Sequence, residues 1–251
     1  TLHRVNSFED RVSAALDKIF DEQERLALAA VNSDVSKSIL GAGVAEGVEN
    51  IITSTDLRQV SEQLLPVIQD IYRKGVEDTV EEGYGSEVTE PTETAASSQQ
   101  IVVVNNFNDT TEEEIQSALT TAAVLTDDDG GDVDIALKLA LAYSLIKAIF
   151  NKLRASRKNL ILETAVYGSY NQGLFDAAVA NEATRSRTLM KEWVSMLDGK
   201  VRDSHRTLHG DKVQVGAPFF VNGVAIRFPK DPLAPPNLTI GCRCVLKFSI
   251  N

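Results

Sequence analysis

Two histidines and two cysteines near the carboxyl end are the side chains best suited to chemistry. The stretch "VRDSHRTLHG" contains His205 and His209, and "GCRC" contains Cys242 and Cys244, the only cysteines of the chain. Residues four apart share one face of a helix, and residues two apart on a strand point to the same side. Two imidazoles and two thiolates make the donor set of a closed, tetrahedral zinc site. The sequence therefore predicts a structural zinc ion held by these four residues.

The same residues have other interpretations. His205 could hydrogen-bond to the proline-rich loop at 229–237, with both cysteines packed as small apolar side chains. A cysteine nucleophile would need a third residue to orient its histidine base, and none is evident. A zinc peptidase would need a glutamate that "HRTLH" lacks. A metal-dependent hydrolase or nuclease would need an open metal position and a carboxylate, for which Asp203 and Asp211 are the acidic residues beside the histidines.

The elements that must position these residues lie in the carboxyl-terminal part of the chain. Apolar periodicity and turn residues predict a helix, a strand, a short helix, a hairpin and a final strand, at 159–181, 189–197, 197–210, 217–228 and 242–248. Gly210 would end the short helix, and Asn222-Gly223 is the pair of residues that favours a two-residue hairpin turn. Trp193 is expected in the core. A helix followed by a small antiparallel sheet gives an α+β fold.

The amino-terminal part of the chain is predicted to be largely helical. Apolar residues recur at helical spacing over 5–31, starting at Ser7, and over 54–83, where Pro66 would kink or restart the helix. Residues 132–156 are apolar nearly all round, which predicts a buried helix. Four regions are expected: an acidic helical region 1–82, a linker 83–110 rich in Gly, Ser, Thr and Glu, a helical region 111–158, and a carboxyl-terminal module 159–251. A Gly-rich break at 39–50 and a short strand at 101–107 complete this prediction.

Charge is distributed unevenly along the chain. Residues 1–130 carry 26 acidic and 8 basic side chains, a net charge of −18, whereas residues 131–251 carry 10 and 17, a net charge of +7. The basic half could therefore contact something acidic, such as another subunit, nucleic acid or the acidic first half. No run of basic residues with interleaved aromatics favours nucleic acid over the others.

Neither the first residues nor the longest apolar run predicts membrane insertion. Residues 1–11 are polar throughout, so we expect no secretion leader there and synthesis in a cytoplasm. The longest apolar run, 135–150, is shorter than the roughly 20 residues that span a bilayer, and it contains Lys138 and Lys147. This run is therefore expected to be a helix of a soluble protein.

Four motifs follow one another in the last part of the chain: "ETAVYGSYNQG", "EWVSMLDGKVRDSHRTLHG", the proline-rich loop and "GCRC". Their order resembles the phage head morphogenesis family, also called the Mu F-like or minor head protein family, over about residues 159–248. The resemblance rests on Trp193, Arg202, His205, Gly210, Cys242, Arg243 and Cys244. The family usually has a small polar or acidic residue where this chain has His209. The resemblance thus supports a ligand role only for His205 and the two cysteines.

The resemblance implies a structural protein with no enzymatic activity. Members are minor components of tailed-phage heads, carried inside the capsid near the portal vertex, and some stay there until DNA is ejected. We therefore expect the portal protein and other head proteins as partners, multiple copies per particle, synthesis in the host bacterial cytoplasm and a final place in the virion. A metal-dependent hydrolase or nuclease and a DNA-binding module are the alternatives from other functional classes.

Overall fold

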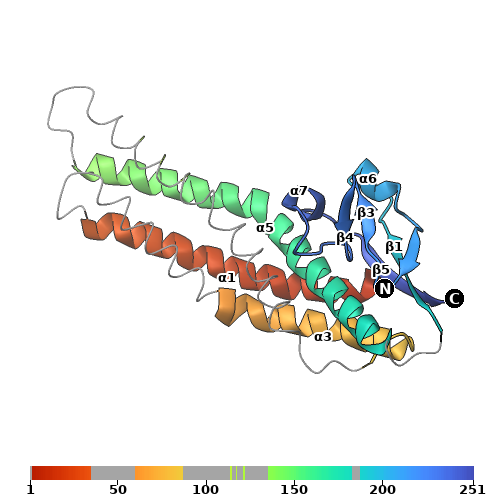
Figure 1. Cartoon of the computed structure of the whole chain (residues 1–251). Helices are drawn as coiled ribbons and strands as arrows, with labels where there is room; N and C mark the ends of the chain where they lie inside the picture. Colours follow the sequence, from red (N-terminus) through yellow and green to blue (C-terminus); the bar gives the residue numbers. More distant parts are fainter. Residues whose placement is uncertain are drawn as a thin grey trace. The chain divides into compact units, whose positions relative to one another are not determined.

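The computed structural model describes residues 2–34, 60–86, 114, 117, 121, 135–182 and 187–251 (Figure 1). The predicted Gly-rich break, most of the predicted linker and the predicted strand at 101–107 lie outside these residues. The described chain is α+β, as the sequence predicts: its first helices are followed by a carboxyl-terminal region with two small antiparallel sheets. The longer helical elements are α1 (Leu2–Asp34), the π-helical turn η1 (Val60–Leu64), α3 (Leu65–Glu81) and α5 (Ile135–Glu182).

Helices α1 and α3 confirm the predicted periodicity, with one correction at a helix start. Helix α1 begins at Leu2 rather than at Ser7, because no glycine or proline before Ser7 interrupts the backbone hydrogen bonds. Helix α3 begins one residue before Pro66, directly after the π-helical turn η1. The sequence predicts a kink or a restart at Pro66, and the structure shows a change from π-helix to α-helix there without a break.

Helix α5 corrects two predictions. The predicted separate helices at 132–156 and 159–181 form one continuous helix of 48 residues, since "SRKN" at 156–159 contains neither glycine nor proline. The apolar segment is also not buried all round. Its buried side chains follow one stripe, Ala142, Ile146, Phe150 and Leu153, whereas Ala148 between them is exposed. The segment thus packs through one face at helical spacing.

The chain divides into two compact units, each built from segments distant in sequence. The first contains Thr1–Val12, Leu65–Val103 and Leu160–Asn251, and the second contains Ser13–Leu64 and Val104–Asn159. Helices α1 and α5 contribute residues to both units. The four regions predicted along the sequence stay a prediction.

In the second unit, basic residues of α5 pair with acidic residues of α1. Arg154 binds Asp21 and Glu24, with both N···O distances 2.7 Å, and Lys158 binds Asp17 at 2.6 Å. These pairs join residues 130 to 141 positions apart. Part of the basic carboxyl half therefore contacts the acidic first half of the same chain. The sequence allowed this partner alongside another subunit and nucleic acid.

In the first unit, α3 and α5 cross with their backbones in contact. A Cβ atom added to Gly173 would lie 2.1 Å from the carbonyl oxygen of Tyr72, and one added to Gly75 would lie 2.4 Å from that of Tyr170. Two tyrosine hydroxyls span the same crossing in opposite directions: Tyr72 donates to Asp176 at 2.9 Å and Tyr170 donates to Asp78 at 2.6 Å. The crossing therefore depends on the two glycines.

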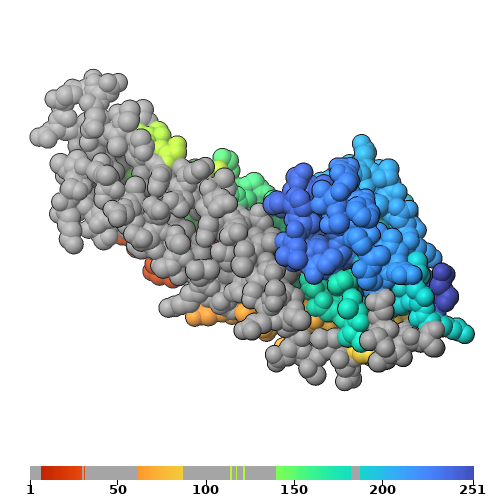
Figure 2. All heavy atoms as spheres, in the orientation of Figure 1, coloured from red at the N-terminus to blue at the C-terminus, as the bar shows by residue number. Residues whose placement is uncertain are grey.

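The sheets of the first unit are antiparallel. Strands β1 (Leu189–Val194), β2 (Lys212–Gln214) and β5 (Val245–Ile250) form a sheet in the order β2-β1-β5, and β3 (Phe219–Val221) pairs with β4 (Val224–Ile226). The predicted hairpin turn is confirmed, since Asn222 and Gly223 have φ of 50° and 81°. Two short helices, α6 (Asp203–Arg206) and α7 (Pro236–Thr239), complete this region. Its atoms, drawn in blue, gather in one continuous mass (Figure 2).

Candidate metal centre

Helix α6 is fixed beside β1 through the residues that follow it. The Trp193 N–H donates to the Asp211 carbonyl at 3.0 Å, and the Gly210 N–H donates to the Trp193 carbonyl at 2.9 Å. Gly210 has φ of 86° and ends the turn that follows α6. The helix itself ends at Arg206, which corrects the prediction of a helix over 197–210 that ends at Gly210. Trp193 is buried and meets the His205 ring edge-on, with ring centroids 5.3 Å apart. The imidazole of His205 is thus held against the core, and the prediction of Trp193 as a core residue is confirmed.

The segment that carries the cysteines is a turn before β5, which corrects the prediction that both cysteines belong to the final strand. Gly241 has φ of 68°, and the Cys244 N–H folds back to donate to the Cys242 Sγ at 3.4 Å. From α5, the buried Asn171 side chain donates to the Cys244 carbonyl and accepts from the Leu246 N–H, both at 2.9 Å. This turn brings both sulfur atoms to the same side.

Three of the four predicted ligands come together. The His205 Nδ1 lies 3.4 Å from the Cys242 Sγ and 3.8 Å from the Cys244 Sγ, and the three ligand atoms lie within 4.8 Å of one another. All three residues are buried, with 1–3% of their surface exposed, and both cysteines are free thiols. The described residues contain one such group of potential metal ligands.

His209 does not join this group, so the predicted four-residue set is wrong at that position. Its side chain is exposed, and its Nδ1 accepts a hydrogen bond from the Ser195 N–H at 3.1 Å. Helix α6 ends at Arg206, so the helical spacing that was expected to align His205 with His209 does not persist. The Ser195 hydroxyl lies nearer the cluster: it donates to the His205 carbonyl at 2.6 Å and lies 3.5 Å from the Cys244 Sγ.

The two thiols influence each other's pKa in opposite directions. Hydrogen bonding from Cys242, followed by contacts with His205 and Ser195, lowers the pKa of Cys244. The same pairing with Cys244, together with burial, raises the pKa of Cys242. Cys244 therefore loses its proton more readily than Cys242. Cys242 stays protonated beside it, because two adjacent buried negative charges repel each other.

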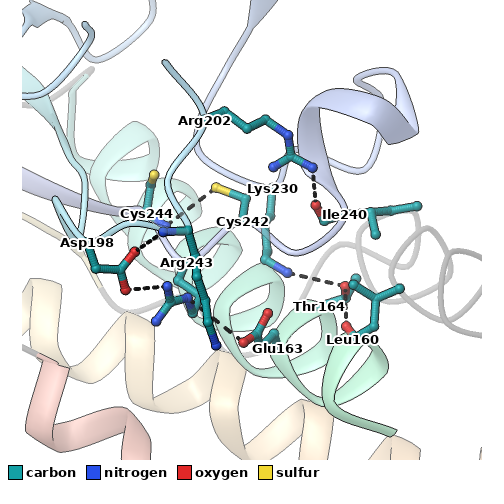
Figure 3. A network of polar contacts seen from close by, with 11 residues as sticks. Leu160, Glu163, Thr164, Asp198, Arg202, Lys230, Ile240, Cys242, Arg243 and Cys244 are labelled. Atoms are coloured by element: carbon teal, nitrogen blue, oxygen red, sulfur yellow. Dashed lines mark hydrogen bonds and ion pairs between the residues drawn. The ribbon is translucent and has the colours of Figure 1, made fainter. Parts of the chain in front are cut away.

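Charged residues surround the cysteine turn (Figure 3). The Lys230 Nζ donates to the Thr164 hydroxyl at 3.2 Å, and burial lowers the pKa of Lys230 to about 7. Arg202 donates to the Ile240 carbonyl at 2.5 Å, which holds the start of the turn. These contacts tie the turn to α5 and to the segment before α6.

Arg243 points away from the two thiols and pairs with acidic residues. Its guanidinium binds the Asp198 carboxylate, and its Nε lies 3.9 Å from Glu163 on α5 (Figure 3). The guanidinium lowers the pKa of Asp198. Arg202 and Arg243, both part of the predicted motif, therefore hold the cysteine turn in place through a carbonyl and two carboxylates.

Three residues that shape this site lie inside the quoted motifs, but the sequence assigned them no role. Asn171 lies between Tyr170 and Gln172 in α5, Ser195 follows β1, and Lys230 lies in the proline-rich loop. Their roles arise from contacts across 73, 49 and 66 positions. The acidic residues that a hydrolase would use, Asp203 and Asp211, are both exposed and lie outside the ligand group.

Comparison with known proteins identifies the family. The model of the family described as Phage Mu protein F like protein matches residues 111–247, more than half of the chain. The match contains the whole ligand group and begins earlier than the resemblance from residue 159 suggests. No curated protein and no solved structure matches the chain. Among the described helices, none has an apolar stretch long enough to cross a membrane.

Proposed function

Since this chain belongs to the Phage Mu protein F like family, a family of phage head proteins, we propose that it is a minor head protein carried inside the capsid and associated with the portal vertex. Its partners would be the portal protein and other head proteins, in multiple copies per particle. It would be made in the host bacterial cytoplasm, remain in the virion, and act in head assembly and in DNA ejection. The family match carries this proposal.

The arrangement of the ligand group supports an assembly role over hydrolysis. A hydrolase needs a carboxylate or another base within hydrogen-bond reach of the attacking water. The three ligand residues are at most 3% exposed, and Asp203 and Asp211 lie at the surface. A substrate would therefore have to enter a packed core to reach the cluster.

Particle assembly with tagged protein tests the proposal. The chain is co-expressed with the portal and major capsid proteins of its phage, and heads are isolated on a density gradient. We expect the tagged chain to sediment with heads, to resist protease until the heads are opened, and to cross-link to the portal protein. An unrelated protein of similar size and charge, expressed to the same level, is the control.

The outcomes separate the parts of the proposal. Recovery of the chain only in the unassembled fraction would overturn the head assignment. Sedimentation with heads combined with immediate protease digestion would place the chain outside the capsid. Protection without a portal cross-link would contradict the portal position while retaining the interior one.

A further inference from the structure

We infer that His205, Cys242 and Cys244 bind one zinc ion through Nδ1 and the two Sγ atoms, with the fourth position beside the Ser195 hydroxyl. This inference does not depend on the phage head role. Helix α6 carries His205, and the turn before β5 carries the two cysteines. Cys242 and Cys244 lie 37 and 39 positions after His205 in the sequence.

The two distances between the His205 nitrogen and the cysteine sulfurs fit a tetrahedral ion. With Zn–S of about 2.3 Å and Zn–N of about 2.0 Å, tetrahedral angles place nitrogen and sulfur about 3.5 Å apart. The two observed N···S distances, 3.4 and 3.8 Å, lie on either side of that value. The Ser195 Oγ lies 3.5 Å from the Cys244 Sγ, which puts the hydroxyl beside the fourth position.

Hydrogen bonding alone explains this convergence less well. A neutral imidazole has one acceptor nitrogen, so only one S–H can donate to it along its lone pair. Here two sulfur atoms approach the same Nδ1 of His205. A metal ion uses the nitrogen and both sulfurs at once, and it compensates the two thiolate charges that would otherwise repel each other.

The surrounding structure holds the ligands in place without a metal. The Ser195 hydroxyl binds the His205 carbonyl, the Cys244 N–H binds the Cys242 Sγ, and Asn171 binds the backbone of the cysteine turn. Fixed ligands lower the entropic cost of binding, and the outer hydrogen bonds orient the donor atoms. Two thiolates and an imidazole favour zinc over magnesium or calcium, which prefer oxygen ligands.

Metal content and cobalt spectroscopy test the site in the full-length protein. Protein purified without chelator from zinc-supplied cells is expected to contain about one zinc per chain. After exchange to Co²⁺, we expect a thiolate-to-cobalt charge-transfer band and intense visible bands of tetrahedral cobalt. His205→Ala, Cys242→Ser and Cys244→Ser should each reduce zinc content at least about tenfold.

His209→Ala is the matched control, because His209 lies four residues from His205 but outside the ligand group. It should retain zinc and the cobalt spectrum. If the ligand variants fail to fold, the cobalt spectrum of the unmodified protein decides the question. Less than about a tenth of an equivalent of zinc, with no charge-transfer band, would overturn the inference. Loss of zinc in His209→Ala as large as in His205→Ala would overturn the three-residue assignment.

Discussion

Asn171 shows how much one buried polar side chain contributes in this protein. Its amide binds the Cys244 carbonyl and the Leu246 N–H, and no part of its surface is exposed. Asn171→Ala would leave both backbone groups without that partner, so we expect a loss of about 2–4 kcal/mol in the free energy of unfolding. Urea unfolding measures this change. Asn237→Ala, at an exposed position of α7, should change stability by less than about 0.5 kcal/mol, and equal losses in both variants would contradict the argument.

Asp176 links stability to pH at the α3–α5 crossing. Burial raises its pKa, while hydrogen bonds from Tyr72 and Gln172 and the charge of Arg227 act in the opposite direction. A carboxyl whose pKa is raised on folding contributes its stability at low pH and loses it as pH rises through the folded pKa.

The prediction concerns the difference in stability between the wild type and Asp176→Asn. We expect the free energy of unfolding of the wild type, relative to this variant, to decrease as pH rises from about 3 to 7. Denaturant titrations of both proteins at several pH values measure this difference in the free energy of unfolding. A difference that increases over this range would show that the hydrogen bonds outweigh burial.

At the scale of elements, the glycines at the α3–α5 crossing determine how closely the helices approach. Gly173→Ala would place Cβ 2.1 Å from the backbone oxygen of Tyr72, which a side-chain movement cannot relieve. We expect a loss of about 3 kcal/mol or more, because the two helices must separate. Gly199→Ala is the control, since a Cβ atom added at Gly199 would meet no atom within 4 Å, and it should be nearly neutral. A small loss in Gly173→Ala, measured by thermal unfolding, would contradict the backbone contact.

The continuity of α5 gives a second prediction for an element. Ser156 lies inside the helix at the point where the sequence predicts a break between two helices. Ser156→Pro removes a helical hydrogen bond and introduces a clash, so it should cost about 3 kcal/mol or more. Ser156→Ala, which removes only the hydroxyl bond to the Lys152 carbonyl, should cost little. Tolerance of proline in circular dichroism and unfolding experiments would favour two separate helices.

At the scale of the whole molecule, removal of metal should affect the two units differently. The proposed zinc ligands all belong to the first unit, whereas residues 140–155 of α5 belong to the second. Chelation should therefore increase amide exchange in β1, α6 and β5 much more than in residues 140–155. Hydrogen exchange with mass spectrometry, with and without chelator, measures this difference. A uniform increase along the chain would contradict a local role for the ion.

The sequence alone determined the α+β class, the helical periodicity of α1 and α3, and the hairpin at Asn222-Gly223. Each of these depends on residues close together in the chain, where periodicity and turn preference act directly. The sequence also indicated the family through a short ordered set of motifs, which the family match confirms. The domain boundaries and the zinc ion stay predictions.

The tertiary structure decided which of these residues meet. Only folding shows that His209 turns to the Ser195 N–H while His205 faces the two thiols, since the helix between them is too short to preserve their spacing. It also pairs Arg154 and Lys158 with acidic residues of α1. Such contacts depend on where distant segments cross, and local sequence preference carries no information about that crossing.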